Sequence, residues 1–334
     1  MVEKKLDGMV ITDLANMRYL VGYSGDNGIL IITKNRSLFF TDFRYQEQSE
    51  KEVHGFDIFI EKEDRPRLVL EKAKSIGVRT LGFESTASYA FYRSLLRKGL
   101  QVRAVSNLVE DMRRVKDRKE LDLIGKAVTR AEEALSEVRP HIREGTKEIQ
   151  LAARLEEALK KNGCASLPFD IIVAAGPNSS MPHAKPGDNK IRAGDLVVVD
   201  WGGEAGGYFS DMTRTFLIRG RDLSKKKEIF LTVLKANLAG IAAAREGVAA
   251  RMVDKAARDV IKNAGYGDFF GHGTGHGVGL NVHELPRISR LGRESLKAGM
   301  VFTVEPAIYI PKVGGVRIED MVLVTDKGCE VLSK

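Results

Sequence analysis

Short apolar runs alternate with longer helical patterns through the N-terminal third of the chain. The runs are rich in β-branched and aromatic residues, which is typical of strands, and they cover residues 8–12, 28–33, 37–41, 56–60, 80–83 and 101–105. Two longer segments, residues 65–77 and 88–99, have a helical pattern that ends in glycine. Strands that alternate with helices predict an α/β domain.

A long amphipathic helix is predicted to open the rest of the chain. Asp117 followed by Glu120 is a candidate capping box, and apolar side chains then recur at helical spacing until Pro140. These side chains are Leu121, Ile124, Val128, Ala131, Leu135 and Val138. We therefore expect two domains, residues 1–114 and 115–334.

The second domain contains a weak internal repeat. IRAGDLVVVD, which ends at Asp200, matches LKAGMVFTVE, which ends at Glu305, at an offset of 105 residues. Upstream, REGT and KKNG within residues 143–163 match REGV and KNAG within residues 245–265, at an offset of 102 residues. Each half is predicted to form two helices and then a β-hairpin that carries acids, which indicates an α+β domain with an internal repeat.

The hairpin of the first half, residues 197–211, poses an electrostatic problem. If it turns between Ala205 and Gly206, Asp200 faces Asp211 across the strands. Like charges at directly opposed positions are destabilising.

The repeat predicts a second acid pair, which the sequence contains. A hairpin centred on Lys312 would place Glu305 opposite Glu319. Four carboxylates that the repeat brings together would repel one another and resist burial unless cations lie between them. The sequence therefore predicts a site for hard or borderline metal ions, and for two of them. Taken singly, Asp200 would more simply be a turn residue and Glu305 the exposed end of a strand.

Residues 271–286, GHGTGHGVGLNVHELP, contain His272, His276 and His283. Imidazole often completes a metal site of this kind. The glycines allow the backbone to approach a neighbour closely, and they must bend the chain if His276 and His283 serve one site, because a straight strand would put them on opposite faces. A further histidine, His183, lies in a proline-flanked loop where a substrate contact would be natural.

Composition narrows the remaining function classes. The net charge is +8 and the pI is near 9.3, but the basic residues are interspersed with acidic ones, which favours a solvated surface over a nucleic-acid site. Cys164 and Cys329 do not make a disulfide framework. With no segment typical of a signal peptide or a transmembrane helix, we expect a cytoplasmic protein without a nucleic-acid or membrane partner.

Four motifs together resemble the pita-bread metallopeptidases, specifically their prolidase and aminopeptidase P branch. They are VVVDWGGEAGGYFSDMTRTF, GHGTGHGVGLNVHELP, FTVEPAIY and GVRIEDMVLV. NMRYLVGYSGDNGILIIT and FFTDFRYQEQ resemble the N-terminal domain of that branch. The resemblance implies a creatinase-type α/β domain, residues 1–114, followed by an α+β pita-bread catalytic domain with a pseudo-twofold repeat. It also implies a homodimer that acts on proline-containing di- or oligopeptides.

The resemblance also implies roles for individual residues. The metal ligands would be Asp200, Asp211, His276, Glu305 and Glu319, with Asp211 and Glu319 bridging two ions. Such a ligand set suits Mn²⁺, Co²⁺ or Fe²⁺, and zinc is a further candidate. Glu305 would accept a proton from the water that the two ions share. His183 and His283 would contact the substrate and steady the tetrahedral intermediate, and Arg317 would lie beside the site and bind substrate.

The function that follows is hydrolysis of Xaa-Pro bonds, preferably in dipeptides. Arg287, four residues past His283, would bind the carboxylate of the substrate proline; the alternative is a surface arginine paired with Glu284 or Glu294. The main alternative activity is that of an aminopeptidase P on longer peptides, and a methionine aminopeptidase is disfavoured. A non-catalytic peptide-binding module and a metal-free, creatinase-like enzyme are disfavoured because all five ligand positions are present.

Overall fold

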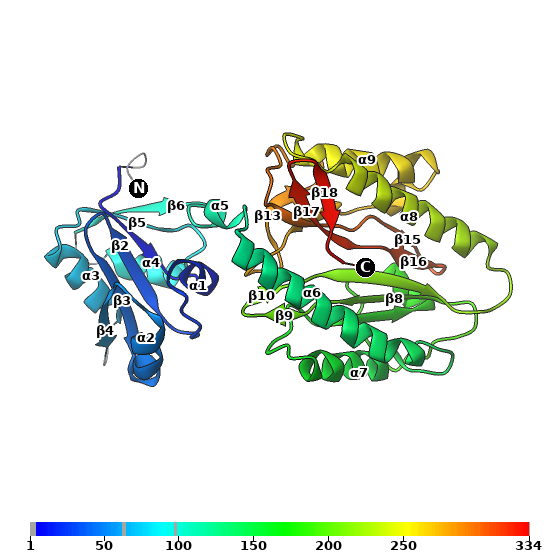
Figure 1. Ribbon diagram of the computed structural model, residues 1–334, viewed down its shortest axis with the longest axis horizontal. Helices are drawn as coiled ribbons and strands as arrows, with labels where there is room; N and C mark the ends of the chain where they lie inside the picture. The colour runs from blue at the N-terminus through cyan, green and yellow to red at the C-terminus, as the bar shows by residue number, and fades with distance from the viewer. Residues whose placement is uncertain (1–4, 62–64, 97–98, 334) are drawn as a thin grey trace. The chain divides into compact units, whose positions relative to one another are not determined.

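The computed structural model describes residues 5–61, 65–96 and 99–333. The chain divides into two compact units, Met1–Arg113 and Arg114–Lys334. Among the described residues, no helix combines the length and the apolar character that crossing a membrane requires. Each unit contains both helices and strands (Figure 1).

The first unit is built on a six-stranded mixed sheet with the order β4-β3-β2-β1-β5-β6. The strands are β1 (Gly8–Ile11), β2 (Ile29–Thr33), β3 (Ser37–Asp42), β4 (Asp57–Glu61), β5 (Thr80–Glu84) and β6 (Gln101–Val105). All six strands were predicted. Alternate side chains of β1 enter two different cores, with Val10 on one face and Met9 and Ile11 on the other, as the two-residue period of a strand requires.

In the described part of this unit, five α-helices accompany the sheet: α1 (Leu14–Val21), α2 (Gln46–Glu52), α3 (Arg65–Ser75), α4 (Tyr89–Leu95) and α5 (Glu110–Arg113), together with the short helix η1 (Phe43–Tyr45). The predicted segments 65–77 and 88–99 contain α3 and α4. Sequence reasoning missed α1, α2 and the short α5. Asp13 caps α1 by accepting a hydrogen bond from the Asn16 N–H, and Gly22 ends the helix in the left-handed conformation, so its start and stop signals were present.

The first half of the second unit begins with α6 (Arg118–Val138), and the predicted capping box of Asp117 and Glu120 is confirmed. It continues with η3 (Arg139–His141), α7 (Glu148–Lys161), β7 (Ile172–Ala175), η4 (Gly176–Ser180), β8 (Leu196–Trp201), β9 (Glu204–Ala205), β10 (Tyr208–Phe209) and β11 (Met212–Leu217). The strands β11, β8 and β7 form a three-stranded sheet in that order.

The second half repeats this order. It contains α8 (Ser224–Ala243), α9 (Ala250–Asn263), η5 (Gly267–Phe269), β12 (Gly275–Gly277), β13 (Glu284–Ile288), β14 (Val301–Val304), β15 (Ala307–Ile310), β16 (Gly314–Arg317), β17 (Asp320–Thr325) and β18 (Gly328–Val331). The main sheet has the order β13-β12-β14-β17-β18, and β15 pairs with β16.

The predicted internal repeat is confirmed by the backbone. An isolated β-bridge between Lys147 and Lys190 ties the start of α7 to the segment before β8. A second bridge, between Ala249 and Ser295, ties the start of α9 to the segment before β14. The predicted fold class, an α/β domain followed by a duplicated α+β domain, is therefore correct.

The predicted register of the first hairpin is wrong. Asp200 pairs with Thr213, not with Asp211. The turn is formed by Gly206 and Gly207, which both have positive φ, 58° and 84°, as a two-residue hairpin turn of type I′ requires. Two adjacent glycines meet that requirement at no steric cost, whereas the predicted turn would place Ala205 there.

The predicted register of the second hairpin is confirmed. Val304 pairs with Asp320, and Ala307 pairs with Arg317. Both pairs belong to one register centred on Lys312, so Glu305 and Glu319 lie at matching positions between two paired segments. Pairing is interrupted at the acids themselves, where Pro306 has no N–H to donate.

Candidate metal centre

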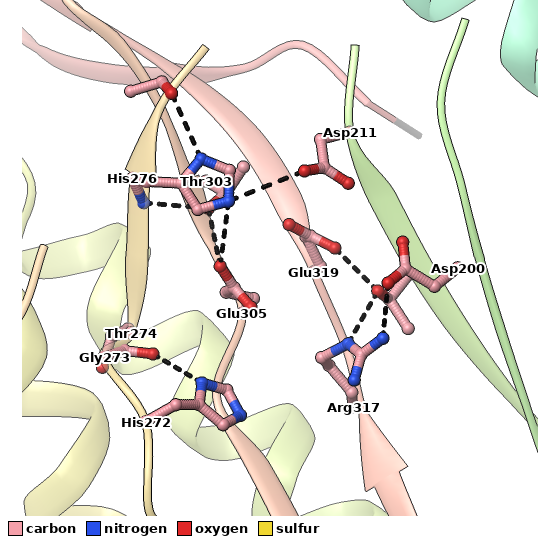
Figure 2. A network of polar contacts seen from close by, with 12 residues as sticks. Asp200, Asp211, His272, Gly273, Thr274, His276, Thr303, Glu305, Arg317 and Glu319 are labelled. Atoms are coloured by element: carbon pink, nitrogen blue, oxygen red, sulfur yellow. Dashed lines mark hydrogen bonds and ion pairs between the residues drawn. The ribbon is translucent and has the colours of Figure 1, made fainter. Parts of the chain in front are cut away.

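Four carboxylates and one imidazole converge from both halves of the second unit (Figure 2). Three overlapping groups have ligand atoms within 4.8 Å of one another: Asp200, Asp211 and Glu319; His276, Glu305 and Glu319; and Asp211, His276 and His283. The structure therefore brings together all five predicted ligands. The third group adds His283, which was predicted to contact the substrate.

A β-bridge joins the two halves at the acids. Thr213 on β11 bridges to Glu319, whose backbone N–H donates to the Thr213 carbonyl oxygen at 3.1 Å. The Thr213 hydroxyl in turn donates to Glu319 Oε2 at 2.7 Å. Arg214 Nη1 donates to the Glu319 carbonyl oxygen at 2.6 Å. The backbone and the side chain of Glu319 are thus both fixed by the hairpin of the first half.

The interrupted pairing at Glu305 leaves backbone groups that other parts of the fold satisfy. The Glu305 N–H donates to the Thr274 carbonyl oxygen at 2.7 Å. Asn237 on α8 is 1% exposed, and its Nδ2 donates to the carbonyl oxygens of Val304 at 2.9 Å and Ile318 at 3.4 Å. Because buried backbone groups need partners, Asn237 holds the two strands where they separate around the acids.

Close backbone packing places His276 in the site. A side chain at Gly275 would collide with the Thr303 carbonyl oxygen, and one at Gly277 with the Leu285 carbonyl oxygen. A bulge follows His276, and the rings of His276 and His283 lie 4.2 Å apart between centroids. The predicted bend of the glycine-rich segment is confirmed.

The tautomer of His276 follows from its partners. Its Nδ1 lies 3.1 Å from the Gly277 carbonyl oxygen, which can only accept, so Nδ1 carries the proton. Nε2 faces the acids and lies 3.3 Å from Glu305 Oε1 and 3.6 Å from Asp211 Oδ2. A neutral imidazole with its second nitrogen held by a carbonyl is the form that binds metals.

Burial dominates the electrostatics of the acids. It raises the pKa of Asp200, and it raises the pKa of Glu305 to about 7. For Asp211 and Glu319, burial and then the neighbouring carboxylates raise the pKa well above its ordinary value. Among the described residues, buried Asp200 Oδ1 has no hydrogen-bond partner. Unmet acceptors and raised carboxyl pKa values are what a divalent cation would relieve, so these residues fit a metal centre.

Arg317 supplies the permanent positive charge beside these acids. Its guanidinium contacts Asp200 Oδ2 at 2.5 Å through Nη2 and the Thr213 hydroxyl at 3.0 Å through Nε. Nη1 donates to the Tyr309 hydroxyl at 2.7 Å and to the Pro182 carbonyl oxygen at 3.3 Å. Arg317 is only 4% exposed, and these contacts are with the protein itself. Its predicted contact with substrate stays a prediction.

Comparisons with known proteins match both units. Residues 122–326 match the model of metallopeptidase family M24, and residues 1–115 match the creatinase/prolidase N-terminal domain. This chain belongs to metallopeptidase family M24. Membership of a metallopeptidase family implies divalent metal ions, and the acid and histidine groups described above provide candidate ligands.

Several relatives of this metallopeptidase are similar over nearly their whole length. An Xaa-Pro dipeptidase of Pyrococcus horikoshii is 38% identical over 338 residues, which span 100% of this chain and 94% of the relative. The structure of an Xaa-Pro dipeptidase from Bacillus anthracis matches with a TM-score of 0.96 at 39% identity, over 100% of this chain and 94% of that one. The structure of an X-Pro aminopeptidase from Thermotoga maritima matches with a TM-score of 0.90 at 34% identity, over 98% of this chain and 96% of that one.

The predicted substrate contacts of the metallopeptidase lie around the acids. His183 and His283 are both exposed. Partial burial, and then the neighbouring His276 and His183, lower the pKa of His283 to about 4. Its imidazole is therefore neutral at physiological pH, and a neutral imidazole can donate one hydrogen bond.

Arg287 is exposed on β13, directly opposite His276. Directly opposed residues of an antiparallel pair share a face, so the Arg287 side chain leaves the strand pair on the same face as His276. The predicted alternative paired its side chain with Glu284 or Glu294. Glu284 instead binds Lys116 at 2.6 Å, and Glu294 accepts the backbone N–H of Arg287 at 2.8 Å.

Sequence reasoning named His272 only among the candidate imidazoles of the glycine-rich segment and did not single out Tyr309, and the structure places both in the same network. His272 Nδ1 donates to the Gly273 carbonyl oxygen at 2.7 Å, and Nε2 accepts from the Tyr309 hydroxyl at 3.3 Å. Burial lowers the pKa of His272 to about 4 and raises that of Tyr309 to about 12. The spacing of His272 four residues before His276 in one glycine-rich motif was the available signal.

Proposed function

We propose that this metallopeptidase hydrolyses Xaa-Pro dipeptides with two divalent metal ions. The observation that carries the proposal is the buried group of carboxylates around His276, set in a chain that matches M24 family members over its length. The relatives named as Xaa-Pro dipeptidases support the substrate class.

Two ligand groups support two ion positions. Asp200, Asp211 and Glu319 would hold one ion, and His276, Glu305 and Glu319 the other, with Asp211 also placed to bridge. A set of carboxylates with one imidazole favours Mn²⁺ or Co²⁺, with Fe²⁺ and Zn²⁺ as further candidates. When bound, such ions lower the pKa of a water between them and polarise the scissile carbonyl.

Glu305 is the proposed proton carrier. The nitrogen of an Xaa-Pro bond has no hydrogen, so it must gain a proton to leave as a secondary amine. Glu305 lies beside His276 at the edge of the acid group and can accept the proton of the attacking water and deliver it to that nitrogen. His183 and His283 would donate hydrogen bonds to the oxygen on which negative charge develops.

Arg287 is proposed to set the preference for dipeptides. In a dipeptide the proline carries a free carboxylate, and a guanidinium can bind both of its oxygens. Arg287 is exposed and shares the face of its strand pair with His276, which supports this role.

The test compares substrates with and without the carboxylate. Arg287→Ala should lower kcat/KM for Xaa-Pro by more than tenfold, since a charge-assisted bidentate contact is worth about 1.5–3 kcal/mol, and should spare activity on Xaa-Pro-amide. Arg290→Ala, at an exposed arginine three residues on, is the matched control and should change neither. Equal losses on both substrates would contradict the role of Arg287.

The second candidate is an aminopeptidase P, favoured by the similarity to the Thermotoga maritima enzyme. It predicts that the wild-type protein cleaves Xaa-Pro-Yaa tripeptides faster than Xaa-Pro dipeptides. The same assay therefore separates the two activities.

We further infer a homodimer in the cytoplasm. The dimer rests on the family resemblance, and the location rests on the two cysteines, Cys164 and Cys329, which are free thiols. Light scattering of the purified protein measures the oligomeric state, and a monomer would contradict the first inference.

A further inference from the structure

We propose that Glu148 is a positioning residue that holds the His183 loop, defined as residues 176–186, against the metal centre. The inference rests on the proposed function, because it assigns the effect of Glu148 to the step that His183 assists. Glu148 is the first residue of α7 and is 1% exposed. No role in the site follows for it from the ligand groups themselves.

The Glu148 carboxylate joins both ends of the His183 loop. Its Oε1 accepts hydrogen bonds from the Ala175 N–H at 2.8 Å, where the loop leaves β7, and from Asn189 Nδ2 at 2.9 Å. Its Oε2 accepts from the Gly187 N–H at 3.3 Å, just past the loop. Asn178, inside the loop, donates through Nδ2 to both oxygens at 3.1 and 3.2 Å.

The first turn of α7 strengthens this attachment. The N–H groups of Glu148 and Ile149 donate to the carbonyl oxygens of Asn189 and Gly187, each at 3.0 Å. Such N–H groups have no partner within a helix, so the returning end of the loop occupies positions that the helix leaves open. The carboxylate then connects this end to β7, which closes the loop.

The closed loop reaches the metal centre through its middle. The Pro182 carbonyl oxygen accepts from Arg317 Nη1 at 3.3 Å, and Arg317 in turn holds Asp200. His183 is the next residue along the chain and is exposed. Its location therefore depends on the loop backbone, whose two ends meet at Glu148.

The second half also holds a histidine-bearing segment with a buried carboxylate, although from a helix position that does not match Glu148, because the repeat offset of 102 residues aligns Glu148 with Ala250. Asp254 on α9 is also 1% exposed and accepts from the N–H and the hydroxyl of Thr274 at 3.1 and 2.9 Å. It binds Arg258 at 2.7 Å, and Arg258 Nη2 donates to the His272 carbonyl oxygen at 2.7 Å. In each half, a buried carboxylate on the second helix holds a histidine-bearing segment beside the acids.

Glu148→Gln is the sharpest perturbation, because it preserves shape and removes one acceptor. Every partner of the carboxylate described above is a donor, so the amide NH₂ must face at least one other N–H. A buried group left unsatisfied in this way releases one attachment of the loop. Glu156→Gln is the matched control on the same helix, at a surface pair with Lys160.

The experiment is a double-mutant cycle on the metal-loaded full-length enzyme with an Xaa-Pro dipeptide. Glu148→Gln should lower kcat by about tenfold or more with KM and metal content unchanged, as expected for a contact that acts in the transition state. In a His183→Ala background the same change should cost less than twofold, because the two residues act through one contact. Glu156→Gln should match wild type in both backgrounds.

Independent effects would overturn the proposal. If the losses from Glu148→Gln and His183→Ala multiply, or if Glu148→Gln lowers Tm while kcat stays at the wild-type value, Glu148 is only a structural residue. If Glu148→Gln does not fold, Asn178→Ala can replace it, because this variant removes the hydrogen bonds from the loop to Glu148. Asn178→Ala should show the same coupling to His183. Its additivity with His183→Ala would equally overturn the proposal.

Hydrogen exchange tests the attachment of the His183 loop to Glu148 independently of the proposed function. Amide exchange in residues 176–187 should accelerate in Glu148→Gln and not in Glu156→Gln, whatever the substrate. If wild type cleaves no Xaa-Pro dipeptide, the proposed function fails, and unchanged exchange in Glu148→Gln would overturn the loop attachment by itself.

Discussion

Glu305 offers the most direct test of the claim that the buried acids need cations. Replacing it with glutamine in chelated protein removes its ability to ionise and keeps its shape. Without metal, burial raises the pKa of wild-type Glu305 to about 7, although the charge of Arg317 acts in the opposite direction. The protonated acid and the glutamine are then similar neutral groups, so the two proteins should differ only where wild-type Glu305 is driven to ionise.

The size and sign of the effect follow from linkage. A rise from the ordinary 4.5 to about 7 corresponds to about 3 kcal/mol, at about 1.4 kcal/mol for each tenfold change. The acid binds its proton more tightly in the folded state, so its contribution to stability is fully present below pH 4.5 and is lost as pH rises to about 7. Above pH 7, chelated Glu305→Gln should therefore be the more stable protein by up to about 3 kcal/mol.

Urea unfolding in chelator at several values between pH 5 and pH 8 measures this difference. Titration of His272 and His283, whose pKa values are lowered to about 4, affects both proteins and cancels in the comparison. With Mn²⁺ present the order should reverse, because the variant has lost a ligand. Equal stability of the chelated proteins at pH 8 would refute the argument that Glu305 is ionised at a cost without metal.

Three further results are expected. Chelation should abolish Xaa-Pro hydrolysis, and Mn²⁺ or Co²⁺ should restore it. Elemental analysis of Asp211→Asn should show the loss of at least one ion. An unchanged metal count would mean that Asp211 does not bridge. His283→Ala should retain both ions and lose about 10²–10⁴-fold in kcat, whereas loss of metal would make His283 a ligand, as its proximity to Asp211 and His276 also allows. Lys116→Met should cost about 3–5 kcal/mol of unfolding free energy, because it breaks a buried ion pair with Glu284 whose side chains are only 1% and 7% exposed. Lys160→Met, at a surface pair, should cost less than about 1 kcal/mol.

The two hairpins show what local sequence can and cannot determine. The register around Lys312 was predictable because the acids lie symmetrically about the turn, and the structure confirms it. The register of the first hairpin depended on choosing among several glycines. Requiring φ above zero at two successive positions selects Gly206 and Gly207, so the error came from matching charges before matching turn geometry.

The residues that support the site could not be predicted from the sequence, for a different reason. Asn237, Thr213 and Glu148 act through partners between 27 and 106 positions away. Nothing in the local pattern marks an asparagine on α8 as the partner of two distant carbonyl groups. Motifs identify groups whose chemistry is unusual in itself, such as opposed acids, whereas groups that only satisfy a neighbour become visible once the neighbour is placed.

The distribution of charge around the centre supports a division of labour among the acids. Glu319 belongs to two of the three-residue ligand groups, with Asp200 and Asp211 in one and with His276 and Glu305 in the other. Burial and then the neighbouring carboxylates raise the pKa values of Asp211 and Glu319 well above their ordinary values, whereas Arg317 bonds directly to Asp200 and offsets part of the effect of its burial. Asp211 and Glu319 each belong to two of the ligand groups, so each lies where it could contact two cations. The central position of Asp211 and Glu319 therefore supports their assignment as bridging ligands, and it explains why Asp211→Asn should disturb the metal count more than a change at a peripheral acid.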